Sequence, residues 1–128
     1  MYVHYNPNPR GRWYAGDCVI RAISKAEGQD DWEKIYAGLS LYGFMIGDIS
    51  ANNGVWDAYL RDNGYTRYIC PNDCPFCYSI ADFAAEHNDG NMYIVGTGHH
   101  AVAVSSGNWY DSWDSGAETP IYYYKKER

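Results

Sequence analysis

The chain has 128 residues, of which 46% are hydrophobic and 20% are charged, a balance typical of a single folded domain spanning residues 1–128. A net charge of −6 without a basic cluster argues against electrostatic binding of nucleic acid. No apolar run approaches the roughly 18–20 residues of a membrane span. The first residues lack the basic and apolar segments of a signal peptide. We therefore expect a cytoplasmic protein with no membrane or nucleic-acid partner.

The N-terminal part predicts an irregular lead-in followed by a helix that begins with a cysteine. Residues 2–16 are rich in Pro, Gly and Asn. Asp17 stands where an N-cap side chain would accept backbone N–H bonds, and Cys18 then falls in the first turn. Gly28 is a plausible end of this helix. Its apolar stripe has the spacing of an amphipathic helix: Val19, Ala22, Ile23 and Ala26.

Three more helices and several strands follow. The second helix covers 32–39 and ends before a glycine-bearing connection at Gly43 and Gly47, and the third covers 55–63. Ser79 and Asp82 have the spacing of a capping box at the start of the fourth. Strands are expected at 65–69, 92–96, 100–105, 109–113 and 121–124, with a hairpin turn at 107–108. Helices followed by strands predict an α+β fold, with the cysteine helix packed on an antiparallel sheet of about four strands.

Three residues suggest a nucleophilic site. The unpaired N–H groups and the dipole of a helix N-terminus stabilise an anion, so the thiol pKa of Cys18 should fall. His100 starts a strand after a glycine-rich segment and is the candidate base. Pairing across the hairpin places Asp111 near it, where a carboxylate would orient the ring. His99 is expected on the opposite face of its strand, and Asp114 in a turn-capping role.

This order of motifs resembles the papain-like cysteine peptidases. Those enzymes carry a cysteine at a helix start, a His-Ala-Val strand and an Asn-Ser-Trp segment, and here Cys18, His100-Ala101-Val102 and Asp111-Ser112-Trp113 take these places. The short chain and the Asp are more like the small bacterial, phage-encoded and bacteriocin-processing members. The resemblance implies a peptidase that cleaves peptide or protein substrates through an acyl-enzyme, without a cofactor.

The chain departs from that family at the oxyanion donor. The family places a glutamine six residues before the cysteine, and this position is Arg12 here. Asn8 and Asn6 lie further upstream and carry the amide that the role requires. We take Asn8, together with the backbone N–H of Cys18, as the candidate donor.

Two alternatives remain open. An acyltransferase or deamidase of the same fold would use the same three residues. A non-catalytic binding module is the other alternative, in which Cys70, Cys74 and Cys77, with His87 as the candidate fourth ligand, hold a structural zinc ion. The Cys-x3-Cys-x2-Cys spacing also matches radical iron–sulfur enzymes, but too few residues follow Cys77 for the βα barrel that such enzymes need.

Overall fold

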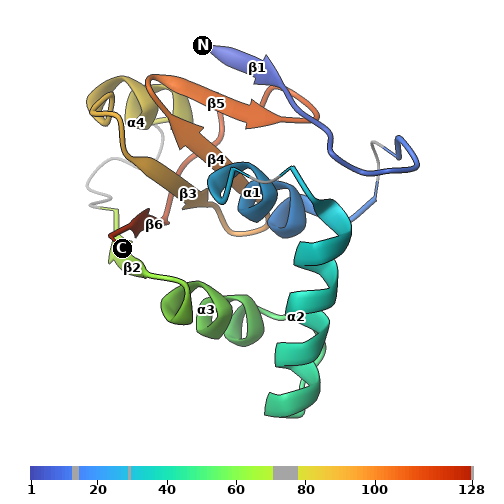
Figure 1. Cartoon of the computed structure of the whole chain (residues 1–128). Coiled ribbons are helices and arrows are strands. Elements are labelled where there is room, and N and C mark those ends of the chain that lie inside the picture. Colours follow the sequence, from blue (N-terminus) through green and yellow to red (C-terminus); the bar gives the residue numbers. More distant parts are fainter. Residues whose placement is uncertain (13–14, 29, 71–77, 128) are drawn as a thin grey trace.

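The computed structural model describes residues 1–12, 15–28, 30–70 and 78–127, and within these ranges the chain is α+β (Figure 1). The helices are α1 (Cys18–Ala26), α2 (Trp32–Ile46), α3 (Asn53–Asp62) and α4 (Ile80–Glu86). The strands are β1 (Tyr2–His4), β2 (Tyr65–Ile69), β3 (Met92–Gly96), β4 (Ala101–Ser105), β5 (Asn108–Asp111) and β6 (Tyr122–Lys126). The predicted class is therefore confirmed.

The sheet is larger than the sequence predicted. Its order is β1-β5-β4-β3-β6-β2, a mixed sheet of six strands in the described part of the chain, where about four antiparallel strands were expected. The lead-in is not wholly irregular, because Tyr2–His4 pairs in parallel with β5 at the sheet edge. At the other edge, β2 joins through its antiparallel pairing with β6. The strand at 65–69 was predicted and β1 was not, and both lie at edges of the sheet, outside the central hairpin.

Helices cover both faces of the sheet. Ala101 and Ala103 of β4 pack in one cluster with Ala22 and Ile23 of α1. The alternate residues Val102 and Val104 pack in a second cluster with Phe83 of α4. Because successive side chains of a strand point to opposite faces, α1 and α4 lie on opposite sides of β4. Figure 1 shows α1 over the middle of the sheet, with α2 and α3 in the lower part of the view. The small side chains of β4 let the N-terminus of α1 approach the start of this strand.

The second helix runs further than predicted. α2 continues through Gly43 and ends at Gly47, which has a positive φ of 86°. Gly43 is inside the helix because the returning chain packs against it: a Cβ at this position would lie 2.7 Å from the backbone oxygen of Asp48. The glycine is therefore a close-packing position rather than part of the predicted connection. The capping box of Ser79 and Asp82 at α4 is confirmed.

A tight hairpin brings two of the predicted site residues together. Ser106 and Gly107 connect β4 to β5 with φ values of 52° and 80°, as in a type I′ turn. The resulting register pairs Ala103 with Tyr110. His100 and Asp111 therefore lie at the same end of the hairpin, which is the end that faces the start of α1.

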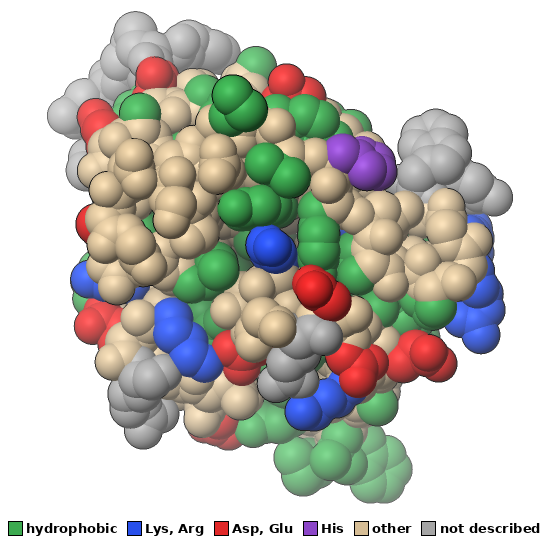
Figure 2. Space-filling model, turned by 45° about the horizontal axis from the view of Figure 1, so that its top comes forward, with side chains coloured by type: hydrophobic (Ala, Val, Ile, Leu, Met, Phe, Trp, Pro, Cys, Tyr) green, Lys and Arg blue, Asp and Glu red, His purple; other side chains and the backbone are tan. Residues whose placement is uncertain are grey.

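In the described ranges, no helix combines the length and apolar character needed to cross a membrane. On the face shown in Figure 2, Lys and Arg side chains alternate with Asp and Glu.

Candidate active site

Cys18 is the first residue of α1 and is only partly buried. Its side chain is hydrogen-bonded to His100, and the backbone N–H of Ala101 also donates to the sulfur. The start of α1 and the start of β4 therefore meet at the sulfur of Cys18. The structure brings the predicted cysteine and histidine together.

His100 lies between Cys18 and Asp111. Its Nε2 is hydrogen-bonded to Oδ2 of Asp111, so Nδ1 is the ring nitrogen that remains for the sulfur. The imidazole is 12% exposed and packs against Trp113, with ring centroids 4.9 Å apart. The three predicted residues therefore form a continuous Cys–His–Asp chain.

Asp111 is held from several sides. Its carboxylate is 1% exposed. Oδ2 accepts a hydrogen bond of 2.7 Å from the hydroxyl of Ser115, and Oδ1 accepts one of 2.7 Å from the backbone N–H of Ser112. Oδ1 also lies 3.1 Å from Nη2 of Arg21. A carboxylate with this many donors has a fixed orientation and a stabilised negative charge.

The pKa values of the three side chains shift in the directions that favour a thiolate–imidazolium pair. Burial raises the pKa of the Cys18 thiol, but the hydrogen bond and charge of His100 and the Ala101 N–H outweigh it, and the pKa is lowered. Burial lowers the pKa of His100, but the hydrogen bonds to Asp111 and Cys18 raise it to about 9. The pKa of Asp111 is lowered, since the bonds from His100 and Ser115 outweigh burial.

Asp17 has a different role from the one predicted. It occupies the N-cap position, but its side chain makes no capping hydrogen bond. Its carboxylate is instead buried, bonds to Arg21, and accepts a 2.8 Å hydrogen bond from Nε1 of Trp32. The guanidinium of Arg21 competes successfully for this carboxylate because both partners of that bond are charged, whereas a capping bond would have only one charged partner.

Arg21 and Ser115 are site residues that the sequence reasoning missed. Arg21 joins the carboxylates of Asp17 and Asp111, and Ser115 is fully buried against Asp111. The i,i+4 spacing of Asp17 and Arg21 was a usable signal for the first pair. Nothing in the sequence around Ser115 distinguishes it from a loop serine.

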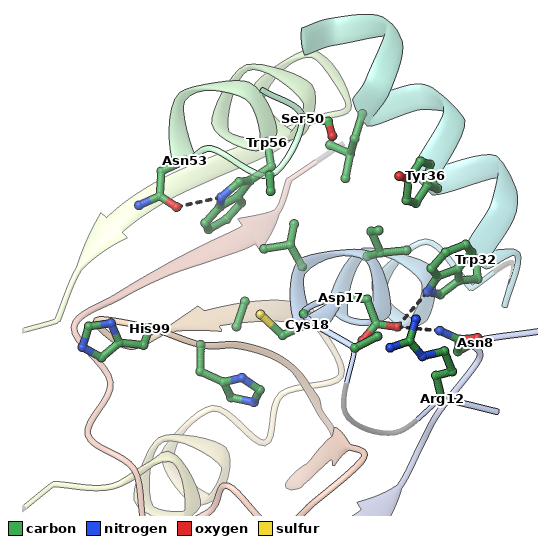
Figure 3. A pocket seen from close by; sticks show the side chains of 18 of the residues that line it. Asn8, Arg12, Asp17, Cys18, Trp32, Tyr36, Ser50, Asn53, Trp56 and His99 are labelled. Atoms are coloured by element: carbon green, nitrogen blue, oxygen red, sulfur yellow. Dashed lines mark hydrogen bonds between the residues drawn. The ribbon is translucent and has the colours of Figure 1, made fainter. Parts of the chain in front are cut away.

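A cleft of about 560 Å³ opens beside the cysteine. Figure 3 shows Cys18 at its base, with Trp32 and Tyr36 of α2 on one side and Trp56 of α3 on another. His100 and Tyr122 also line it. Aromatic side chains from α2, α3 and β6 thus stand among apolar and polar residues in the lining of the cleft, and Cys18 is part of that lining.

Asn8, Asn6 and Arg12 all belong to the segment beside this cleft. Asn8 is buried in its wall, and Nδ2 of Asn8 donates to Asp17 across 3.4 Å (Figure 3). Asn6 lies next to it and accepts a hydrogen bond from the Asn8 backbone N–H. Arg12 also lines the cleft. One of the two N–H groups of the Asn8 amide is engaged with Asp17, and its assignment as oxyanion donor stays a prediction.

The two alternative residues lie outside the Cys–His–Asp chain. His99 is exposed at the rim and points away from Cys18 in Figure 3. Asp114 accepts hydrogen bonds from Nε1 of Trp109 at 2.8 Å and from the backbone of Gly116 at 3.0 Å, which is the turn-capping role expected for it.

The proposed zinc ligands are only partly described. Cys70 is a buried free thiol, and burial raises its pKa to about 11. Nδ1 of His87 lies 2.9 Å from the backbone oxygen of Phe83, on which its ring stacks. Cys74 and Cys77 fall outside the described residues. Among the residues that are described, no group of three or more His, Cys, Asp or Glu side chains is placed to hold a metal ion.

The chain was compared with family models, curated proteins and solved structures, and none of the three comparisons gave a match.

Proposed function

We propose that this protein is a thiol hydrolase that cleaves peptide or amide bonds, a cysteine peptidase with Cys18 as nucleophile. The observation that carries the proposal is that His100 is hydrogen-bonded to Cys18 on one side and to buried Asp111 on the other. A nucleophile, a base within hydrogen-bond reach and a third group that orients the base together define this class of site. The resemblance to papain-like peptidases in the order of the three motifs supports the same reading.

The chemistry follows from the protonation states of the pair. The Cys18 thiolate attacks the carbonyl carbon of the scissile amide, and the C–N bond breaks as the His100 imidazolium donates its proton to the leaving nitrogen. Neutral His100 then takes a proton from water, which attacks the thioester and releases the acid and the thiolate. Asp111 keeps the ring oriented and stabilises its positive charge in both steps.

The cleft supports a peptide as the substrate class. Aromatic rings from α2 and α3 line it beside polar side chains such as those of Ser50 and Asn53, and Cys18 is part of the same lining. Aromatic and apolar walls with a few polar groups are typical of sites that bind small organic groups or peptide side chains. The backbone N–H of Cys18 and the amide of Asn8 are the proposed donors to the oxyanion.

The decisive experiment digests a peptide mixture in oxygen-18 water with wild-type protein and with Cys18→Ala, followed by mass spectrometry. A peptidase creates new C-termini that carry the heavy oxygen only in the wild-type reaction. A deamidase would instead label side-chain carboxylates, and an acyltransferase would join the acyl group to an amine without label. If neither protein changes any peptide and the purified chain carries about one zinc ion, the binding-module alternative replaces the proposal.

A further inference from the structure

Arg21 is a buried cation placed between two carboxylates. It is 4% exposed and sits one helical turn after Cys18 on α1. Its Nη1 is bonded to Asp17, and its Nη2 lies 3.1 Å from Oδ1 of Asp111. The guanidinium therefore links the helix that carries the cysteine to the strand that carries the aspartate.

This arrangement leaves one buried hydrogen-bond donor of Arg21 without an acceptor among the described residues. The Nε–H of Arg21 is buried, and none of the described residues accepts a hydrogen bond from it. A guanidinium free to optimise its own bonds would satisfy this donor, because a buried unpaired N–H is unfavourable. The orientation observed instead aims both Nη atoms at the two carboxylates.

We propose that Arg21 is a positioning residue of this site: it fixes the Asp111 carboxylate beneath His100 and supplies a permanent positive charge next to the Cys18 end of α1. The inference rests on the proposed function, since it assigns a role in a thiolate–imidazolium pair. Arginine suits the role because its planar fork can hold two carboxylates at once and stays charged at every relevant pH. The positive charge of Arg21 also contributes to the lowered pKa of Cys18.

Trp32 extends this network to the cleft wall. Its Nε1 donates to Asp17 across 2.8 Å, and its ring lines the cleft. The line of contacts from the cleft to the site is thus Trp32, Asp17, Arg21 and Asp111. The negative charge of Asp17 compensates Arg21 without contacting the reacting atoms, which makes Asp17 a matched control for the charge of Arg21.

The test measures the rate of iodoacetamide alkylation of Cys18 against pH, by peptide mass spectrometry. Removing the positive charge in Arg21→Gln should move the midpoint of Cys18 ionisation upward by about one pH unit, which is about a tenfold lower rate on the acidic side. Arg21→Lys should keep the midpoint within about 0.3 pH units of wild type, because the charge is retained. Asp17→Asn removes a negative charge and should not move it upward.

Circular dichroism of each variant separates this role from a purely structural one. If Arg21→Gln does not fold, the double variant Arg21→Gln with Asp17→Asn is compared with Asp17→Asn alone, and its midpoint should lie above that of the single variant by about one pH unit, because the two proteins differ only in the positive charge of residue 21. If wild-type Cys18 ionises below pH 7 and the midpoint is unshifted in a folded variant, the role of Arg21 is overturned and the proposed function still stands. A wild-type Cys18 that ionises like an ordinary thiol overturns the proposed function itself.

Discussion

Two cysteines of this chain lie in contrasting surroundings. Cys18 starts α1 and receives hydrogen bonds from His100 and from the Ala101 backbone, and its pKa is lowered although burial opposes this. Cys70 follows β2 and is 4% exposed, and burial raises its pKa to about 11. Burial alone makes a thiol inert, whereas a positive partner and an N–H donor turn a partly buried thiol into a nucleophile. The two thiols therefore differ mainly in the partners of Cys18, which are His100 and the backbone N–H of Ala101.

Replacement of His100 by Ala should remove this difference almost completely. Without the imidazolium, the thiol pKa of Cys18 returns to at least its ordinary value of about 8.5, so alkylation at pH 6 should slow by about a hundredfold or more. Hydrolysis should fall to the background of Cys18→Ala, because the proton donor to the leaving group is lost as well. Alkylation quenched at a series of times and read by peptide mass spectrometry measures the rate at Cys18. A His100→Ala protein that keeps rapid alkylation of Cys18 would contradict the assignment of the base.

Replacement of Asp111 by Asn should weaken the site without abolishing it. Asn keeps an oxygen facing the ring but removes the negative charge that helps to raise the pKa of His100 to about 9. The imidazolium is present below that pKa and is lost as pH rises through it. The alkaline limb of kcat/KM should thus move down by about one to two pH units in the variant. A limb that stays near pH 9 would show that Asp111 does not control His100.

Replacement of Cys70 by Ser should reverse the pattern, affecting stability but not turnover. The new hydroxyl would be buried where none of the described side chains is hydrogen-bonded to the thiol, which costs about 1–3 kcal/mol of unfolding free energy. Turnover should stay within about twofold of wild type, because Cys70 is not among the residues that line the cleft. Thermal unfolding measures the loss, with Cys70→Ala as the apolar control that should lose less. A Cys70→Ser protein that is inactive yet folded would mean that the nucleophile was misassigned.

The smallest effect is expected from His99→Ala. His99 is exposed at the rim of the cleft and points away from the sulfur. Both alkylation of Cys18 and peptide hydrolysis should therefore stay within about twofold of wild type, since no charge near the sulfur is lost. Parallel assays of His99→Ala and His100→Ala compare neighbouring histidines in the same background. The opposite ranking of the two variants would show that the wrong histidine was chosen.

Local sequence patterns predicted most of the helices and strands. The apolar stripe after Cys18, the Ser79 capping box and the apolar run 92–96 each predict an element that forms as expected. Strand β1 was missed because three residues, Tyr2–His4, become a strand only by pairing with β5 more than a hundred residues away. The end of α2 was misplaced because Gly43 is selected by contact with the returning chain, which no local pattern reveals.

Of the candidate site, the sequence predicted Cys18, His100 and Asp111 but not the residues around them. Cys18, His100 and Asp111 each stand at the end of an element whose position the sequence indicates, and the tight hairpin fixes the last two. Arg21 reads as one polar residue of an amphipathic helix, and its role depends on Asp111, ninety positions away. The predicted cap of Asp17 was wrong because the same side chain had a stronger partner in Arg21.

The most direct test of the account is the pH dependence of alkylation of Cys18 and Cys70 in one sample of wild-type protein. Peptide mass spectrometry reads both cysteines at once, so each serves as the reference for the other. The account predicts that Cys18 is already rapidly alkylated below pH 7, while Cys70 stays unreactive until far higher pH. If Cys18 ionises near pH 8.5 like an ordinary thiol, or is no faster than Cys70, the thiolate–imidazolium pair does not exist and the proposed activity is wrong.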